Sequence, residues 1–531
     1  MGSYPSKVSP ETAAHEKAVL ERLRTFQINE ADDGVGGDHD DGFVYVLDSE
    51  KGGGKGGSSI SRNKLARSPE PLPVELMGAW QSKVLEDPKN RLALSALSGA
   101  NPKAVLAQRA AQIADVQVFN VALGPAEGAP ITNQRSSGRC WLFASTNVFR
   151  VALMKKYGLA EFELSQAYLF FWDKLEKANY FLENVVETAG DELDGRLVQR
   201  LLADPVSDGG QWDMVYNLVT KYGLVPQALY PDSWNAMSNG TLNYIVVSKL
   251  REYALKLRKL ASASTATSAT LSATKQKMMR EIHLILTLTL GPPPSSTEKF
   301  DWTFKDKNGK ARTVSLTPLD FARDISSPEF RMTSSAIAGM ISLVHDPRHP
   351  PLSLLTVDRL GNIVGGRGVS YVNVPMATLK QACVATLRAG VPVFFGCDVG
   401  QASDSASGVM DLGLVDWRLG FNVDLLASGG GSSTVSKADR LRVGASAMTH
   451  AMVLTAVHVD EGSGKSVRWR VQNSWGEASG DHGWFVMSDA WMDEFVYQAV
   501  IDPRFLVKEV RDVLKKEPVV LPLWDPMGSL A

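Results

Sequence analysis

The chain changes character near residue 300, and this change limits the folds open to it. Before that point, apolar side chains recur at helical spacing, as in residues 140–157, 165–186 and 212–222. After it, short runs rich in β-branched and aromatic residues are bounded by Gly, Pro, Asn and Asp, which predicts strands. Three consecutive prolines at 292–294 separate the two parts, because a helix cannot continue through them. A helical first half before a strand-rich second half predicts the α+β class.

The expected strands are short and lie throughout the second half. They span residues 301–316, 352–358, 370–374, 391–398, 452–460, 467–473 and 484–488. In the first half, a further helix rich in Lys and Arg is expected over residues 243–260. The Ala/Ser/Thr run at 261–274 is of low complexity and indicates an insertion among helices. No fixed-period repeat is apparent.

Residues 1–70 are predicted to form a flexible N-terminal arm. A short helix is expected at 10–27, and a Gly/Ser-rich linker follows at 52–62. The rest, 71–531, is expected to form the folded protein. We divide it into a helical part up to about residue 300, a strand-rich part up to 515 and a C-terminal tail over 516–531.

Composition excludes several classes of protein. The net charge of -2 gives no global reason to expect nucleic acid or an anionic membrane as partner. Three cysteines without a C-x-x-C pair indicate neither a disulfide framework nor a zinc site, and they favour a reducing compartment. No run approaches the ~20 apolar residues that span a bilayer, and no apolar secretion signal is evident. We therefore expect a cytoplasmic protein with no metal, no cofactor and no membrane contact.

A glycine-containing loop leads directly into an apolar helix that begins at Cys140. The N-terminus of a helix carries partial positive charge and unpaired N–H groups. Both stabilise a thiolate, so we expect the pKa of Cys140 to fall and its nucleophilicity at neutral pH to rise. Gln134, upstream in the same loop, would add an amide donor for an oxyanion. Taken alone, Cys140 fits a buried structural cysteine equally well.

His450 stands at the entry to an apolar expected strand, and the small Ala451 beside it leaves room for a substrate. Asn473 follows at the end of another expected strand, and Trp475 lies two residues beyond it. The Asn side chain can accept the imidazole N–H and fix the ring, while Trp475 can shield that hydrogen bond from water. Each residue alone also fits a structural role. The ordered set Gln…Cys-Trp…His…Asn-Ser-Trp-Gly is far more specific than any of its members.

This ordered set resembles the papain family of cysteine peptidases. The matching positions are Gln134, Cys140, His450 and Asn473. In that family the Gln completes the oxyanion hole, the Cys and His form an ion pair, and the Asn orients the His. The family's glycine pair, which hydrogen-bonds the substrate backbone, is similar to Gly209 and Gly210. The resemblance implies a papain-like fold of two lobes, one helical and one resembling a β-barrel, with a large helical insertion.

The departures from the family pattern are also informative. Cys140 and His450 are 310 positions apart (450 − 140), about twice the ~130–150 usual for papain-like enzymes. Gly-Arg-Cys-Trp replaces the commoner Gly-Ser-Cys-Trp, and the disulfide cysteines are missing. These features resemble an intracellular branch of the family. Four further stretches match that branch, namely residues 162–171, 173–180, 345–350 and 523–528, whereas residues 1–70, 261–274 and 428–436 lie outside the resemblance.

The C-terminal tail carries the implied specificity. Trp524 and Met527 are costly to leave in water, which favours a docked tail. In the intracellular branch the tail lies in the active-site cleft and its terminal carboxylate holds the α-ammonium of the substrate. The resemblance thus implies that Ala531 contributes to substrate binding in an aminopeptidase acting on peptides and amino-acid amides. It further implies hydrolysis of the bleomycin amide and of homocysteine thiolactone, and a homohexamer with sites facing an internal channel.

Other interpretations stay open at this point. The main alternative is a hexameric protein that binds single-stranded nucleic acid, with the helix at 249–259 as candidate lining and the peptidase site secondary. A solvated helix face is the favoured explanation of such a charge run. His345 and His349 have the i, i+4 spacing of metal ligands, but the prolines around them favour a structural loop. Cys383 and Cys397 are expected to be core residues.

Overall fold

The computed structural model describes residues 72–114, 116–124, 128–264, 267–323, 334–425 and 435–530. The N-terminal arm expected over 1–70 and the residue Ala531 lie outside the described residues. The chain divides into two compact units between Ser82 and Lys83. The second unit, Lys83–Ala531, holds all the predicted site residues that are described.

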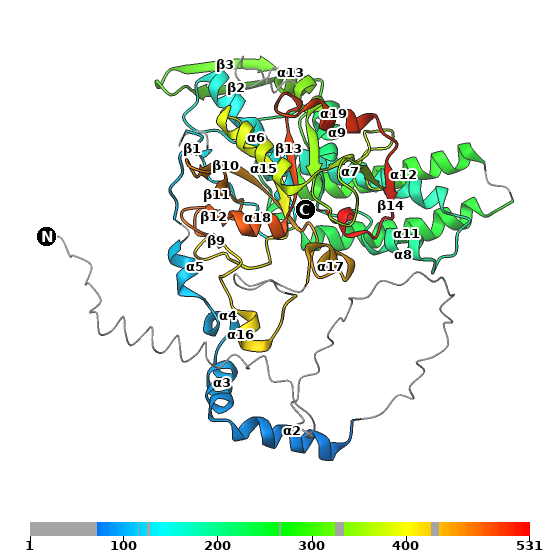
Figure 1. Ribbon diagram of the computed structural model, residues 1–531. Helices are drawn as coiled ribbons and strands as arrows, with labels where there is room; N and C mark the ends of the chain where they lie inside the picture. The colour runs from blue at the N-terminus through cyan, green and yellow to red at the C-terminus, as the bar shows by residue number, and fades with distance from the viewer. Residues whose placement is uncertain are drawn as a thin grey trace. The chain divides into compact units, whose positions relative to one another are not determined.

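Helices dominate up to residue 300, and strands are frequent after it (Figure 1). The elements of the first part are α2 (Val74–Glu86), α3 (Pro88–Gly99), α4 (Pro102–Val105), α5 (Arg109–Ala114), β1 (Val121–Ala122), α6 (Cys140–Tyr157), α7 (Gln166–Glu187), α8 (Arg196–Ala203), α9 (Trp212–Tyr222), α10 (Trp234–Met237), α11 (Gly240–Ala261) and α12 (Ser268–Leu290). Those of the second part are β2 (Phe300–Lys305), β3 (Ala311–Leu316), α13 (Pro318–Arg323), α14 (Ser334–Gly339), β4 (Ile341–Val344), β5 (Leu354–Val357), β6 (Tyr371–Asn373), α15 (Met376–Arg388), β7 (Val393–Cys397), β8 (Ser403–Asp404), β9 (Val409–Met410), α16 (Trp417–Phe421), α17 (Lys437–Arg442), β10 (His450–Val459), β11 (Ser466–Gln472), β12 (Trp484–Ser488), α18 (Asp489–Phe495), β13 (Val496–Ile501), α19 (Lys508–Asp512) and β14 (Val519–Leu521). The α+β prediction is confirmed.

The central helix of the first part is α6, which is buried from Cys140 to Met154. A helix with apolar side chains on all its faces is stable only where every face is covered, which means inside a core. It ends where Gly158 adopts a left-handed conformation with φ of 66°, which glycine adopts without strain. Helices α7 and α9 pack directly on α6, and α11 and α12 pack on α7 and on each other. The helices expected at 140–157, 165–186, 212–222 and 243–260 are confirmed by α6, α7, α9 and α11.

A single sheet of twelve strands organises the second part. The strand order is β14-β5-β6-β4-β13-β7-β10-β11-β12-β9-β8, with β1 also paired to β10. Strand β10 lies deep in the sheet, between β7 and β11. Helix α6 packs against β10, so the first residue of the helix meets the first residues of the strand at the boundary between the two parts.

Two strand predictions are wrong in detail. Residues 301–316 form a separate hairpin, β2 and β3, instead of one strand. The turn between them is built around Asp306, whose side chain accepts the N–H groups of Asn308 and Lys310, and around Gly309 with φ of 79°. Strands β4 and β13 were not predicted; both are buried on both faces and therefore show no polar alternation.

No helix in the described part of the chain combines the length and apolar character needed to cross a bilayer.

Candidate active site

Cys140 is the first residue of α6 and is buried. The backbone groups of Ala451, Trp141 and Cys140 lie near enough to the sulfur to lower the pKa of the thiol, so the sulfur lies beside the residue that follows His450. The preceding Arg139, which departs from the family pattern, is fully buried and forms an ion pair with Asp232 at 2.7 Å. The helix that delivers Cys140 is thus anchored through its N-cap residue.

His450 and Asn473 are brought together by strand pairing. His450 opens β10, and Asn473 directly follows β11, which pairs with β10 in the register Val453 to Gln472. The Nε2 atom of His450 lies 2.9 Å from Oδ1 of Asn473. The backbone N–H of Ser474 donates to the same Oδ1 at 2.8 Å, which fixes the orientation of the amide. Since Nε2 is engaged by Asn473, Nδ1 is the imidazole nitrogen that can exchange a proton with Cys140.

Trp475 covers this pair. Its ring lies 4.9 Å from the imidazole of His450 between centroids, at an interplanar angle of 35°. Phe485 packs edge-on against the other part of the indole at 5.9 Å. In this position Trp475 can shield the hydrogen bond between His450 and Asn473 from water, a role that stays a prediction.

Burial sets the charge state of both groups. It raises the pKa of the Cys140 thiol to about 11, although the backbone hydrogen bonds lower it. The predicted fall in this pKa is therefore wrong, because loss of water penalises the thiolate more than the helix end stabilises it. Burial also lowers the pKa of His450 to about 4, against the raising effect of Asn473. A lone charge is disfavoured at either group, so a thiolate forms most readily together with an imidazolium, by transfer of one proton.

Gln134 is tied to the segment that carries Asn473. Its backbone N–H donates to the carbonyl of Ser474 at 2.8 Å, and its Oε1 accepts the Ser474 hydroxyl at 2.7 Å. Its Nε2 donates to the carbonyl of Ser137 at 2.6 Å. An amide nitrogen carries two hydrogens, so one hydrogen remains to bind an oxyanion.

The glycine pair, Gly209 and Gly210, lies against the first turn of α6, and both positions are too crowded for a Cβ atom. A Cβ on Gly210 would come within 2.6 Å of the Trp141 ring, and one on Gly209 within 2.7 Å of Leu530. The Trp141 indole N–H donates to the carbonyl of Asp208 at 2.7 Å, which fixes the pair beside α6.

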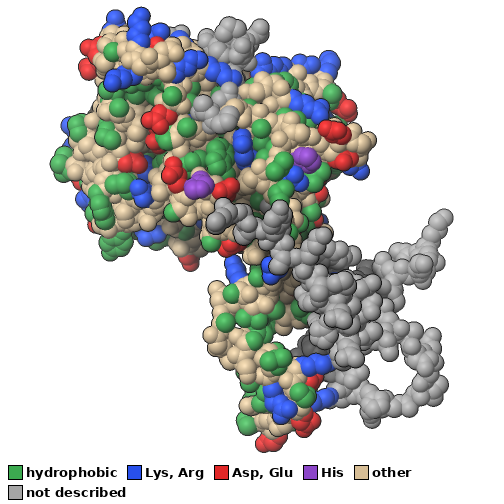
Figure 2. All heavy atoms as spheres, turned by 90° about the vertical axis from the view of Figure 1, so that its left-hand side faces the viewer, with side chains coloured by type: hydrophobic (Ala, Val, Ile, Leu, Met, Phe, Trp, Pro, Cys, Tyr) green, Lys and Arg blue, Asp and Glu red, His purple; other side chains and the backbone are tan. Residues whose placement is uncertain are grey.

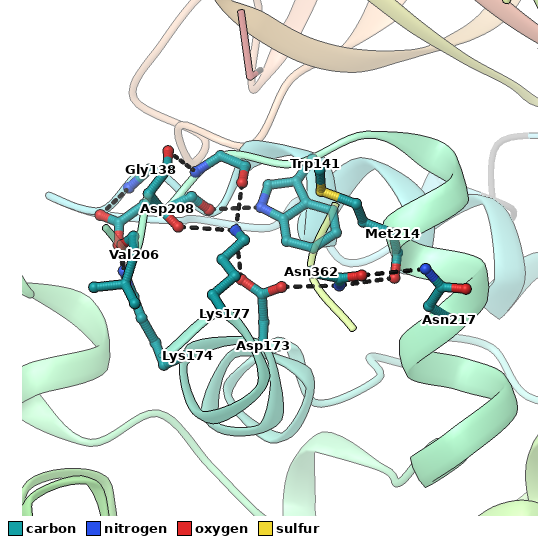
Figure 3. A network of polar contacts seen from close by, with 12 residues as sticks. Gly138, Trp141, Asp173, Lys174, Lys177, Val206, Asp208, Met214, Asn217 and Asn362 are labelled. Carbon is teal, nitrogen blue, oxygen red and sulfur yellow. Dashed lines mark hydrogen bonds and ion pairs between the residues drawn. The ribbon is translucent and has the colours of Figure 1, made fainter. Parts of the chain in front are cut away.

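A buried group of charges supports this glycine segment from below (Figure 3). Lys177 of α7 donates to the carbonyl of Gly209 at 2.6 Å and forms an ion pair with Asp173 at 2.7 Å. Lys174, one turn earlier, pairs with Asp208 at 2.5 Å. The sequence analysis did not identify these four residues. The available signal was a cluster of charged residues, Asp173, Lys174, Glu176 and Lys177, directly after an apolar and aromatic run in the same helix.

The C-terminal tail runs to the glycine pair. The side-chain amide of Gln211 donates to the carbonyl of Ser529 at 2.9 Å, and Leu530 lies against Gly209. Met527 is buried, which confirms the prediction of a docked tail, whereas Trp524 keeps 39% of its surface exposed. Ala531, the predicted partner of the substrate amine, lies outside the described residues.

The remaining candidates have structural roles. Cys383 and Cys397 are buried, as expected, and Cys397 pairs across the sheet with His450. His345 and His349 lie in a loop, and no group of three potential metal ligands occurs among the described residues.

Two arginines of the basic helix are engaged in contacts with other segments of the chain. In α11, Arg251 donates to the carbonyls of Leu202 and Ala203, and Arg258 donates to those of Thr188 and Asp191. Figure 2 faces the side drawn at the left in Figure 1, away from α11, and there side chains of both charge signs are mixed with apolar ones. The contacts of Arg251 and Arg258 favour a structural role for these two arginines.

Comparisons with known proteins agree with this geometry. A model of the Peptidase C1-like family matches residues 71–528. Bleomycin hydrolase of Homo sapiens is 43% identical over 466 residues, which cover 87% of this chain and 99% of the relative. Cysteine proteinase 1, mitochondrial, of Saccharomyces cerevisiae is 40% identical over 479 residues, covering 88% and 94%. A crystal structure of PepW from Lactobacillus rhamnosis matches with a TM-score of 0.80 and 39% identity, over 87% of this chain and 99% of that one.

The chain therefore belongs to the Peptidase C1-like family, and it is a cysteine peptidase. The intracellular branch that the sequence resembles is that of the bleomycin hydrolases, and this resemblance is confirmed at 40–45% identity over most of the chain. The papain-like α+β fold is confirmed by the family match and the PepW structure.

Proposed function

We propose that the protein is a cysteine aminopeptidase that removes N-terminal residues from peptides and amino-acid amides. The observation that carries the proposal is the position of the tail. Leu530 lies against Gly209, where residues upstream of a scissile bond would bind in an open papain-like cleft. A cleft filled in this way accepts a substrate whose chain begins at the scissile residue.

The proposed nucleophile is Cys140, with His450 as base and Asn473 as the residue that orients it. The Cys140 sulfur attacks the substrate carbonyl carbon as its proton passes to Nδ1 of His450. The Cys140 backbone N–H and the remaining amide hydrogen of Gln134 stabilise the oxyanion. The imidazolium then protonates the leaving amine, which leaves a thioester on Cys140. His450 next removes a proton from water, and the hydroxide attacks the thioester carbonyl. The bond from that carbon to the Cys140 sulfur breaks, the product acid leaves, and the imidazolium returns its proton to the sulfur.

The substrate amine needs a fixed anion near the glycine pair. We propose that the terminal carboxylate of Ala531 supplies it, one residue beyond Leu530, as the resemblance implies. A carboxylate and an ammonium group form a charge-assisted hydrogen bond, which recognises the amine and not the side chain. Broad side-chain tolerance follows.

Two particular substrates are proposed in addition to peptides, one from the names of the relatives and one from its chemistry. Several are named bleomycin hydrolase, and we propose hydrolysis of the bleomycin amide by the same thioester route. Homocysteine thiolactone would react likewise, since it joins a free amine to an activated carbonyl. Gly209, Gly210 and Trp475 are proposed to line the site that receives these substrates.

We also propose a homohexamer in the cytoplasm. Three free cysteines suit a reducing compartment. Since the yeast relative is named as mitochondrial, the location of a tagged chain is the appropriate measurement. Native mass spectrometry measures the assembly, and any ring other than six subunits contradicts the hexamer.

Mass analysis of the products from a peptide of mixed sequence tests the aminopeptidase proposal. Stepwise loss of single N-terminal residues is the expected result, and an acetylated N-terminus should abolish cleavage. Deleting Leu530 and Ala531 should yield longer fragments and remove the need for a free amine. An unchanged product pattern after that deletion would sink the tail model while leaving Cys140 chemistry untouched.

A further inference from the structure

The loop at 345–350, singled out in the sequence for its histidines, holds an arginine between two carboxylates. The guanidinium of Arg348 donates through Nε to Oδ1 of Asp346 at 2.9 Å and through Nη2 to Oδ2 at 2.8 Å. The same guanidinium donates to both oxygens of Asp525, through Nη2 at 2.7 Å and Nη1 at 3.2 Å. The side chain keeps 11% of its surface exposed, so water competes little for these contacts.

The Asp346 end of this arrangement is rigidly held. Asp346 is fully buried, and its backbone N–H donates to Oδ1 of Asn373 at 2.9 Å. The Asn373 Nδ2 donates in turn to the carbonyls of Asp346, His349 and Pro350 at 3.0–3.1 Å. One buried amide thereby fixes the backbone of the whole loop, and the loop presents Arg348 to its other partner.

That partner belongs to the tail. Asp525 caps the 3₁₀ turn Pro526–Gly528 by accepting the backbone N–H of Met527 at 2.8 Å. The last ladder residue of the chain is Leu521 in β14, so the described residues beyond it have no strand partner. Chain ends of this kind fray unless they are tied down. The ion pair between Arg348 and Asp525 holds residues 522–530 near their middle.

Other contacts also hold the tail. Gln211 donates to the carbonyl of Ser529 at 2.9 Å, and the Tyr371 hydroxyl donates to that of Met527 at 3.4 Å, but neither involves a charged pair.

Two further contacts are of another kind. Arg196 lies over the half-exposed ring of Trp524 at 4.2 Å, a contact that water weakens. Met527 is buried in the core, which fixes the middle of the segment without orienting its end. The guanidinium of Arg348 fixes both the position and the direction of the tail at Asp525, because two of its N–H groups donate to the two carboxylate oxygens.

We propose that Arg348 is a specificity-determining residue that acts through the tail. By holding Asp525, it keeps Leu530 against Gly209 and so restricts the enzyme to the removal of single residues. Released from Arg348, the tail leaves the glycine pair, and upstream residues of a longer chain bind there. This inference rests on the proposed aminopeptidase function for its effect on products, but not for its effect on the tail itself.

The variant Asp525→Asn tests the clamp with little risk to folding. The Asn oxygen can still accept the Met527 N–H, and the buried pair of Arg348 and Asp346 stays intact. Asp502→Asn is the matched control. Asp502 caps the 3₁₀ turn Pro503–Phe505 in the same way and pairs with Arg504 at 3.2 Å, but it lies outside the tail.

Two readouts are compared, namely amide hydrogen exchange over residues 522–530 and the lengths of peptide products. A lost charge-assisted hydrogen bond should raise tail exchange roughly tenfold to a hundredfold in Asp525→Asn. Di- and tripeptide products should appear alongside single residues, and Arg348→Lys should give the same direction of change. Asp502→Asn should leave both readouts at the level of the unmodified chain.

The outcomes separate the inference from the proposed function. If exchange in the tail stays unchanged in Asp525→Asn, Arg348 does not hold the tail and the inference is overturned. If exchange rises but products remain single residues, the role in specificity is overturned. If the unmodified chain releases no single residues, the aminopeptidase proposal and the specificity role fall together, while exchange still decides whether Arg348 anchors the tail.

Discussion

The two sides of the active site are held by different chemistry. On the helical side, buried charges support the glycine pair and the segment around Cys140: Lys174 and Lys177 pair with Asp208 and Asp173 and donate to backbone carbonyls (Figure 3). On the strand side, His450 and Asn473 are placed by the register of β10 and β11 and covered by Trp475. The strand register places the side chains of His450 and Asn473 directly. A glycine segment has no side chains to pack and needs outside donors to its carbonyls.

The two sides should therefore respond differently to substitution, in activity and in stability. Loss of a strand-side residue should remove activity while the fold persists. Loss of a buried charge on the helical side should remove stability as well, because it leaves the opposite charge unpaired in the interior.

Cys140→Ala should have the largest effect on activity. If the sulfur is the nucleophile, kcat/KM for an amino-acid amide should fall at least about 10⁴-fold, with thermal stability unchanged or raised. Stopped assays with a fluorogenic amide and a thermal melt measure the two. Cys383→Ala, another buried thiol, is the control for loss of a sulfur, and retained activity in Cys140→Ala refutes the assignment.

Lys177→Met should mainly lower stability. Asp173 would lose its cation inside the protein, which costs about 3–5 kcal/mol. Chemical denaturation measures this free energy of unfolding. Adding Asp173→Leu should restore most of it, yet KM should stay raised, since the Gly209 carbonyl still lacks its donor. Equal stability of Lys177→Met and the unmodified chain would show that the buried pair is not what holds this side.

Asn473→Ala should lower kcat without a comparable loss of stability. The imidazole loses the acceptor that orients it, worth about 1–3 kcal/mol, or roughly tenfold to a hundredfold in rate. Asn473→Gln should not restore the rate, because the longer side chain displaces the oxygen. A loss of stability as large as in Lys177→Met would erase the contrast between the two sides.

The pH dependence should be the smallest effect near neutrality. Burial lowers the pKa of His450 to about 4, so the base stays unprotonated above that pH. Activity should therefore be level from pH 8 down to about 5 and fall about tenfold per pH unit below 4, where protonation removes the base. A profile of kcat/KM against pH shows this limb, and a midpoint near 6.5 would mean that the imidazole is exposed to water.

Local signals in the sequence were enough for much of the fold. Helix α6 begins at the predicted Cys140 and ends at the predicted Gly158, because an apolar run and a left-handed glycine act over a few residues. The hairpin β2–β3 was predictable from the sequence but predicted as one strand: Asn308-Gly309 is a strong turn signal, and the polar residues 306–310 separate its two strands. Strand β13, buried on both faces, offered no alternation to detect.

The site residues were predictable as a motif, but their environment was not. The motif fixed the order of Cys140, His450 and Asn473, and the structure brings the second and third into contact at 2.9 Å. The rise in the pKa of Cys140 comes from packing by elements distant in sequence, which the helix-end argument does not contain. Lys177 and Arg348 were missed as supports, because their partners lie on other elements that only the fold brings near.

Alkylation of the three cysteines tests the central claim most directly. The folded chain is treated with one equivalent of iodoacetamide at pH 7, and mass spectrometry of its peptides locates the adduct while residual activity is followed. We predict a single adduct on Cys140 that forms in step with the loss of all activity, and that forms far more slowly in His450→Ala, where no imidazole can take the proton. An adduct on Cys383 or Cys397, or full activity after Cys140 is modified, would contradict the account.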